Sequence, residues 1–379
     1  LTQPTHIANH NGRSVMKTKL CSLTVSLMAC CLAPAALAAG TLNIYNWGEY
    51  FAPDTIARFE KETGIKVRLD VYDSNEVLQT KLLAGNSGYD LVFPSNDFLT
   101  RQIQSGVYQK LDKRKLTNLK NLDPAFVPKV DSVDPGMQYS VPYMWGTTAI
   151  GYNVDKVKKA LGGQLPANSY DLLFKPEVLA KLQGCNVAYN DAGSVMLPMA
   201  MRYLGLDPNS TSAKDYDAAY AVLAKARPYV KRLIATPVMN DLANGEVCVS
   251  TGYSGAVLVA KLRAKQNKNG QNIAYTIPQQ GAPMWFDSMV IPKDAKNVDN
   301  AHLFINYLLR PDVIASISNA VMYPSPNAQA AKLMSQDLTG DPMIYPDAAR
   351  MKTFWVQRPL EPAVQRIQTR LWQKFKTGR

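Results

Sequence analysis

Histidine is scarce in this sequence of 379 residues, which contains three, and only His302 lies beyond residue 39. A zinc site would therefore find almost no imidazole ligands, and a Ser–His–Asp triad would have one possible base. Residues 252–256 (GYSGA) resemble a nucleophile elbow, but Ala256 stands where that motif needs glycine. The motif G-x-x-x-x-G-K-S/T is missing, as is G-x-G-x-x-G after the first predicted strand. These absences argue against an enzyme, and we predict no cofactor and no metal ion.

Long uncharged apolar runs are also missing, except near the N-terminus. There, Met16 opens a short basic stretch, residues 20–39 carry no charge, and residues 36–39 (ALAA) form an A-x-A cleavage pattern. This combination predicts a secretory signal peptide, with residues 1–15 as an upstream extension. A membrane anchor and a lipoprotein modified at Cys30 are the alternatives.

Only two of the five cysteines, Cys185 and Cys248, lie outside the predicted signal peptide. In an oxidising compartment two remaining cysteines usually pair, which favours a disulfide. A metal site is the alternative, and the shortage of histidine argues against it.

The formal net charge is +12, from 42 basic and 30 acidic residues, which raises the question of nucleic-acid binding. The densest basic stretches are residues 110–115, 263–268 and 366–379. Each is short and none carries a recognisable nucleic-acid motif, so we interpret them as solvated surface and expect no nucleic-acid partner.

The first hundred residues after the signal peptide alternate between strand and helix patterns. Strands are predicted over 41–47, 66–72 and 89–94, and helices over 53–62 and 76–84, the second capped by Asn75. This order predicts a parallel sheet with helices on its faces. Ligands of such sheets bind beyond the carboxyl ends of the strands, which here are residues 46–50, 73–75 and 94–96.

A second α/β unit is predicted after residues 148–153, which have the pattern of a strand that crosses between domains. It includes expected strands over 186–189 and 245–252 and an expected helix over 213–226. Further short strands are expected over 274–278 and 288–292, followed by an amphipathic segment over 301–309. Two α/β lobes joined by more than one crossing strand would form a cleft, which is typical of hinged binding proteins.

Several aromatic residues fall at strand ends or in turn-like segments: Trp47, Tyr50, Tyr253, Trp285, Phe286 and Tyr323. For any one of them alone, a place in the hydrophobic core is the simpler interpretation. Their positions relative to the predicted strands favour a ligand box for several of them.

Seven segments together carry a resemblance to a known family. They are residues 46–55 (NWGEYFAPDT), 73–78 (DSNEVL), 142–145 (PYMW), 151–156 (GYNVDK), 240–245 (NDLANG), 306–312 (NYLLRPD) and 366–370 (RIQTR). In this order, over the whole mature chain, they resemble the periplasmic polyamine-binding proteins of ABC importers, in particular the putrescine-binding branch.

The resemblance implies an α/β, two-lobed periplasmic binding protein fold with a ligand cleft at the hinge. It also implies a Cys185–Cys248 disulfide and transfer of a small amine to ABC permease subunits in the inner membrane. We expect a periplasmic monomer whose lobe 1 comprises residues 40–147 and 263–322. Lobe 2 would comprise residues 148–262 and 323–379.

The resemblance further assigns an amine site. Its aromatic walls would be Trp47, Trp285 and Tyr323, because an ammonium is attracted to aromatic faces. Tyr253, from the set of aromatic residues at strand ends and turns, is a further candidate for ligand binding. Asp287 would bind one ammonium, since a buried cation without such a partner is costly. Ser95 and Tyr50 would supply the remaining hydrogen bonds.

The sequence departs from the family at the second ammonium. Ala256 replaces an expected aspartate, and residues 191–195 read DAGSV, with Ser194 and Val195 where acids are expected. If a helix begins shortly after Ser194, with Pro198 in its first turn, its free N–H groups would favour an anion. We therefore predict a small amine-bearing ligand, possible examples being ω-amino acids such as 4-aminobutyrate and 5-aminovalerate. The alternatives are a putrescine- or polyamine-specific binding protein and a periplasmic polyamine sensor subunit.

Overall fold

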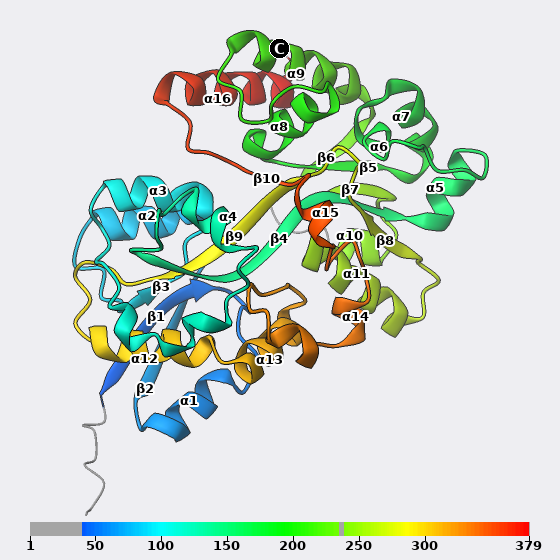
Figure 1. Ribbon diagram of the computed structural model, residues 1–379. Helices are drawn as coiled ribbons and strands as arrows, with labels where there is room; N and C mark the ends of the chain where they lie inside the picture. Colours follow the sequence, from blue (N-terminus) through cyan, green and yellow to red (C-terminus); the bar gives the residue numbers. More distant parts are fainter. Residues whose placement is uncertain (1–39, 235–238, 379) are drawn as a thin grey trace, which may run out of the picture. The chain divides into compact units, whose positions relative to one another are not determined.

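The computed structural model describes residues 40–234 and 239–378, and residues 39–379 form one compact unit (Figure 1). The predicted signal peptide and Cys21, Cys30 and Cys31 lie outside the described residues. The strand–helix alternation predicted after residue 40 is confirmed, with parallel pairing of β1 to both β2 and β3. The elements are β1 (Thr41–Trp47), α1 (Thr55–Thr63), β2 (Lys66–Tyr72), α2 (Asn75–Leu83), β3 (Leu91–Val92) and α3 (Asn96–Gln104).

The cap of α2 differs from the prediction. Ser74, not Asn75, is the N-cap, and its side chain accepts a hydrogen bond from the N–H of Val77. Ser74 has the extended backbone that a cap needs, whereas Asn75 is already helical. The Asn75 side chain is thereby free to accept a hydrogen bond from the N–H of Ser95, at 3.1 Å.

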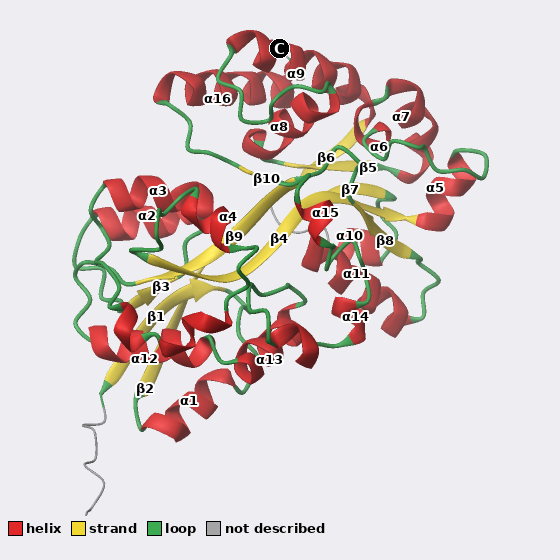
Figure 2. Cartoon of the chain, viewed as in Figure 1, coloured by secondary structure: helices red, strands yellow, loops and turns green. Residues whose placement is uncertain are grey.

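The ten strands of the described residues belong to one sheet, whose main order is β2-β1-β3-β9-β4-β7-β5-β6, with β10 paired to β9 and β8 to β4 (Figure 2). The further strands are β4 (Ser140–Asn153), β5 (Val187–Asn190), β6 (Val230–Ile234), β7 (Val249–Tyr253), β8 (Ile273–Thr276), β9 (Pro283–Val290) and β10 (Trp355–Val356). The longest strand, β4, pairs with β9 up to Thr147 and with β7 from Thr148 onward. It therefore runs through both halves of the sheet.

Helices pack around the two halves of the sheet and enclose two hydrophobic cores. Helices α12 and α13 lie with α1 beside the β1–β3 half, whereas α8, α9 and α16 pack against one another near β5 and β6 (Figure 1). The remaining α-helices are α4 (Val127–Asp131), α5 (Val154–Ala160), α6 (Asp171–Phe174), α7 (Pro176–Leu182), α8 (Gly193–Tyr203), α9 (Ala213–Ala226), α10 (Met239–Ala243), α11 (Ser254–Asn267), α12 (Val298–Leu308), α13 (Pro311–Val321), α14 (Gln336–Thr339), α15 (Ala348–Met351) and α16 (Pro362–Thr377).

Within the described ranges, none of the helices combines the length and the apolar character needed to cross a bilayer. Cys185 and Cys248 form a disulfide, with Cα atoms 5.4 Å apart, in agreement with the prediction. Of the expected lobe boundaries, 147/148 coincides with the change of partner along β4, whereas 262/263 falls inside α11.

Candidate functional site

Asp287 is a buried carboxylate on β9, with 4% of its surface exposed. Its two oxygens accept hydrogen bonds from the Tyr50 hydroxyl at 2.7 Å and the Ser95 hydroxyl at 2.6 Å. No cation lies within ion-pair distance of it among the described residues. Burial raises the pKa of Asp287 to about 7, opposed by the two hydroxyl hydrogen bonds and reinforced by the negative charge of Asp97. Asp287 is therefore a buried acid for which the described part of the fold supplies no cation.

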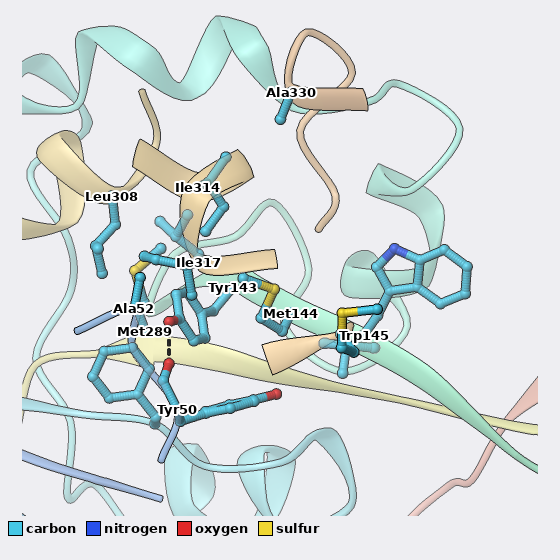
Figure 3. Close-up of a cluster of buried hydrophobic side chains, with 14 of the residues drawn as sticks. Tyr50, Ala52, Tyr143, Met144, Trp145, Met289, Leu308, Ile314, Ile317 and Ala330 are labelled. Carbon is cyan, nitrogen blue, oxygen red and sulfur yellow. Dashed lines mark hydrogen bonds between the residues drawn. The ribbon is translucent and has the colours of Figure 1, made fainter. Parts of the chain in front are cut away.

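Tyr50 is held in place by a buried apolar cluster that Figure 3 draws. Its backbone carbonyl accepts a hydrogen bond from the Tyr143 hydroxyl at 2.6 Å, and the two rings meet edge to face at 5.3 Å. Burial, followed by the charge of Asp287, raises the pKa of Tyr50 well above its usual value. Tyr50 is thus a fixed hydrogen-bond donor to Asp287.

Four of the predicted aromatic residues form a connected cluster beside Asp287. Trp285 lies edge to face with Tyr253, at 5.8 Å between ring centroids, and with Tyr323, at 5.1 Å. Tyr323 in turn meets Tyr50 at 6.2 Å. Trp285 and Asp287 are two residues apart on β9 and so project from the same face of the strand. Rings and carboxylate therefore share one face of the sheet.

Two glycines make room for these rings. A Cβ at Gly146, opposite Trp285 on β4, would come within 2.5 Å of Cζ2 of Trp285. A Cβ at Gly255 would come within 2.5 Å of Cε1 of Tyr323. Both separations are far below van der Waals contact. The rings can therefore occupy these positions only because residues 146 and 255 are glycines, which have no Cβ.

Phe286 does not belong to the cluster. It is fully buried and packs edge to face on Phe126 at 5.6 Å. Strand alternation puts it on the opposite face of β9 from Trp285 and Asp287, so it is a core residue.

Trp47 is half-buried at the end of β1, packs on Tyr72 at 4.6 Å, and donates its indole N–H to the carbonyl of Phe93.

The region around residues 191–195 also differs from the prediction. Helix α8 begins at Gly193, before Ser194, and Pro198 lies inside the helix rather than in its first turn. Val195 is half-buried and packs against the second core, and the Ser194 carbonyl accepts a hydrogen bond from the Gln357 side chain. Ala256 is buried in the first turn of α11.

Asp191, the acid nearest to this region, is already paired within the fold. Its carboxylate accepts hydrogen bonds from the indole N–H of Trp372 at 2.9 Å and from Nζ of Lys376 at 3.0 Å. Both partners lie on α16, which packs so closely on α8 that a Cβ at Gly193 would come within 2.6 Å of Trp372. Asp191 therefore joins the connection between β5 and α8 to α16.

A cavity of about 270 Å³ lies between α2 and α3 on one side and α8 and α16 on the other. Its lining includes Asp97 and Glu76, which the sequence analysis missed. The only signal in the sequence was the place of Asp97, one residue beyond a predicted strand end. The other lining residues are Phe98, Arg101, Gly193, Ser194, Gln357, Arg358, Pro359, Leu360, Gln365, Gln368, Thr369, Trp372 and Gln373.

Comparison with known proteins identifies the class of this chain. Residues 54–346 match the family of bacterial extracellular solute-binding proteins, and the chain belongs to that family. The spermidine/putrescine ABC transporter substrate-binding protein PotD from Streptococcus pneumoniae has a similar structure, with a TM-score of 0.79 and 29% sequence identity. That likeness covers 89% of this chain and 99% of the other. The chain thus has the two-lobed periplasmic binding protein fold that its sequence predicted, with the cleft at the hinge.

More similar sequences narrow the comparison to polyamine-binding proteins. The putrescine-binding periplasmic protein PotF of Escherichia coli K12 is 49% identical over 93% of this chain and 96% of its own length. SpuD of Pseudomonas aeruginosa, described in the same words, is 48% identical over 89% of this chain and 92% of its own length. These relatives confirm the resemblance to the putrescine-binding branch. They also confirm that the chain is a solute-binding protein rather than an enzyme.

Proposed function

We propose that this protein captures putrescine or a closely related polyamine and delivers it to an ABC importer. The observation that carries the proposal is the buried Asp287 carboxylate, which has two hydroxyl donors but no cation among the described residues. An ammonium that entered beside it would supply the missing positive charge.

The aromatic cluster supports a cationic ligand. Rings of Tyr253, Trp285 and Tyr323 would attract an ammonium through their faces, by about 0.5–2 kcal/mol each once water is excluded. In the proposed site Tyr50 and Ser95 orient the Asp287 carboxylate, and Trp47 forms a further wall at the end of β1. The same walls accommodate the methylene groups of an alkyl diamine.

The relatives favour putrescine over the ω-amino acids predicted from the sequence. Both PotF and SpuD carry putrescine in their names, and a third relative, from Pseudomonas aeruginosa, is a putrescine/agmatine-binding protein that is 42% identical over 95% of this chain. The argument for an anion near α8 is also weaker, because the carbonyl of Ser194 and the Asp191–Lys376 pair occupy this region.

The cellular setting forms part of the same proposal. Residues 16–39 would act as a signal peptide that sends the protein to the periplasm, where it would work as a monomer. Its lobes would meet at β4 near residues 147 and 148 and close over the ligand. The closed form would dock on permease subunits in the inner membrane.

Calorimetric titration of the purified protein with putrescine and with 5-aminovalerate tests this function. We expect putrescine to bind more tightly. Asp287→Asn should make the free energy of putrescine binding less favourable by about 2–4 kcal/mol, as expected when one partner of a buried charge pair is removed. Asp299→Asn is the control, because this side chain is 83% exposed and pairs with Lys115 at the surface. Tighter binding of 5-aminovalerate, or equal effects of both substitutions, would contradict the proposal.

A further inference from the structure

The start of α3 brings a second carboxylate to the proposed amine site. Asn96, which is 2% exposed, accepts a hydrogen bond from the N–H of Phe286 at 2.9 Å, and Ser95 forms an antiparallel bridge with Asp287. These contacts fix the first turn of α3 against β9. Asp97 is the next residue and is half-buried. It lies close enough for its charge to raise the pKa values of both Asp287 and Tyr253.

No cation pairs directly with the Asp97 carboxylate in the described part of the chain. It forms no ion pair there, and no side chain donates a hydrogen bond to it. Burial raises its pKa to about 6, with Glu76 adding to the shift and Arg101 opposing it. Arg101 lies instead over the ring of Phe98, at 4.9 Å from its centroid.

The lining of the cavity that contains Asp97 also includes a buried amide, that of Gln368. Gln368 on α16 is 8% exposed, and its amide nitrogen has no hydrogen-bond partner among the described residues. In this orientation the amide nitrogen can only donate, so it cannot pair with an ammonium, which also only donates. The two ends of an amide are interchangeable by a half-turn, so the same side chain can present its oxygen to an ammonium. Arg358 also borders this cavity and adds positive charge at its rim.

We infer that Asp97 binds the second ammonium of the diamine, in place of the acids that are missing at Val195 and Ala256. This inference rests on the proposed function, because it requires the first ammonium to lie at Asp287. A diamine would then span the aromatic cluster, with one carboxylate near each end. Asp97 is consequently a specificity residue that distinguishes diamines from monoamines.

A pair of ligands of equal length tests this assignment. Putrescine and 1-aminobutane share a four-carbon chain but differ by the second ammonium. Calorimetric titrations would measure the binding of putrescine and of 1-aminobutane to three proteins: the wild type, Asp97→Asn and Asp287→Asn. Asp97→Asn should bind putrescine about 10- to 100-fold more weakly and leave 1-aminobutane within about twofold. Asp287→Asn should lower the affinity for both putrescine and 1-aminobutane.

The alternative results are distinguishable. If Asp97→Asn binds putrescine as the wild type does, or weakens both amines equally, the role of Asp97 is refuted while the proposed function stands. If the wild type binds neither amine, both are refuted. Glu76→Gln is the matched control, since it removes the other acid of the same cavity. A larger loss of putrescine binding in Glu76→Gln than in Asp97→Asn would assign the second ammonium to Glu76 and overturn the inference.

Discussion

Asp90 and Asp287 are both buried, and the fold surrounds the two carboxylates with different hydrogen-bond donors. Asp90, which is 2% exposed, accepts five hydrogen bonds from N–H groups of Asn43, Lys296 and Asn297, at 2.8–3.1 Å. Asp287, which is 4% exposed, accepts two from hydroxyl groups. Backbone and amide donors cannot turn away from Asp90, whereas hydroxyl groups can also accept. The number and kind of donors therefore distinguish Asp90, which the fold satisfies fully, from Asp287, which we propose to bind a ligand.

The largest expected effect tests this difference through stability. Asp90→Asn removes the charge and turns an amide N–H₂ toward a ring of donors, so we expect unfolding to require about 3–5 kcal/mol less free energy. Asp287→Asn should leave the stability of the ligand-free protein unchanged or raise it, because a buried charge disappears and the hydroxyls can reorient. Chemical denaturation of both variants at pH 8 measures this. Equal destabilisation would contradict the distinction.

The second expected effect separates global stability from binding. The Cys185–Cys248 disulfide closes a loop across a sequence separation of 63 residues, so its loss should cost about 2–5 kcal/mol of stability. Neither cysteine contacts the Asp287 site, and we expect putrescine affinity to change less than threefold. Thermal melting and calorimetry of a Cys185→Ala, Cys248→Ala double variant check both expectations. A large loss of affinity in a protein that remains folded would show that the two regions are coupled.

The third expected effect is a pH dependence of ligand affinity. With a pKa of about 7 for Asp287 in the ligand-free protein, a cation binds to its ionised form, and affinity should fall about tenfold per unit below pH 7. The fall should steepen below about pH 6, where Asp97 also takes up a proton. Titrations between pH 5 and 8, in two buffers of different ionisation enthalpy, should detect proton release on binding near pH 7. A pH-independent affinity would be incompatible with this assignment.

Stability should depend on pH in the opposite direction from binding: affinity rises with pH, whereas the contribution of Asp287 to the unfolding free energy falls. The pKa of Asp287 in the folded, ligand-free protein lies above its unfolded value of 3.8. The proton on Asp287 therefore contributes stability that is fully present below about pH 4 and is lost as the pH rises through about 7. The difference in unfolding free energy between the wild type and Asp287→Asn should follow this curve.

The smallest expected effect concerns Asp191. Its ion pair with Lys376 leaves these side chains 24% and 34% exposed, and such pairs contribute about 0–1 kcal/mol. Asp191→Asn should therefore lower stability slightly and leave putrescine affinity within about twofold of the wild type. A strong loss of binding would show that the Asp191 side chain gives up its contacts with α16 and takes part in ligand binding.

The sequence predicted the fold well where local signals agreed with one another. Helix α9 matches residues 213–226, and Gly64 at φ 74° ends α1 in the left-handed conformation that glycine favours. Strand β6 was missed, because VKRLI has two charged residues in a row and no strict alternation. Strand β9 begins at Pro283, earlier than predicted, since its first residues obtain their partners from distant β4 and β10.

The site could be predicted only in part. Asp287, Tyr50 and Ser95 were identified by resemblance, and the structure brings their side chains together. Asp97 escaped notice because an acid in the first turn of a helix already has an ordinary explanation in the helix dipole. Its closeness to Asp287 arises from the contact of Asn96 with β9, a pairing 190 residues apart in sequence. No local pattern encodes such a contact.

Strand β4 has a mechanical consequence. Its 14 residues form one strand, paired with β9 before Thr148, with a register shift between Pro142 and Met144, and with β7 from Thr148 on. A strand resists stretching but twists and bends readily, so the separation of the two half-sheets along β4 is fixed while their mutual angle is adjustable. We therefore expect opening of the protein to be a rotation about the segment at Thr147 and Thr148. Spin labels placed near this segment should keep their spacing when ligand binds, whereas labels at the lobe tips should approach each other.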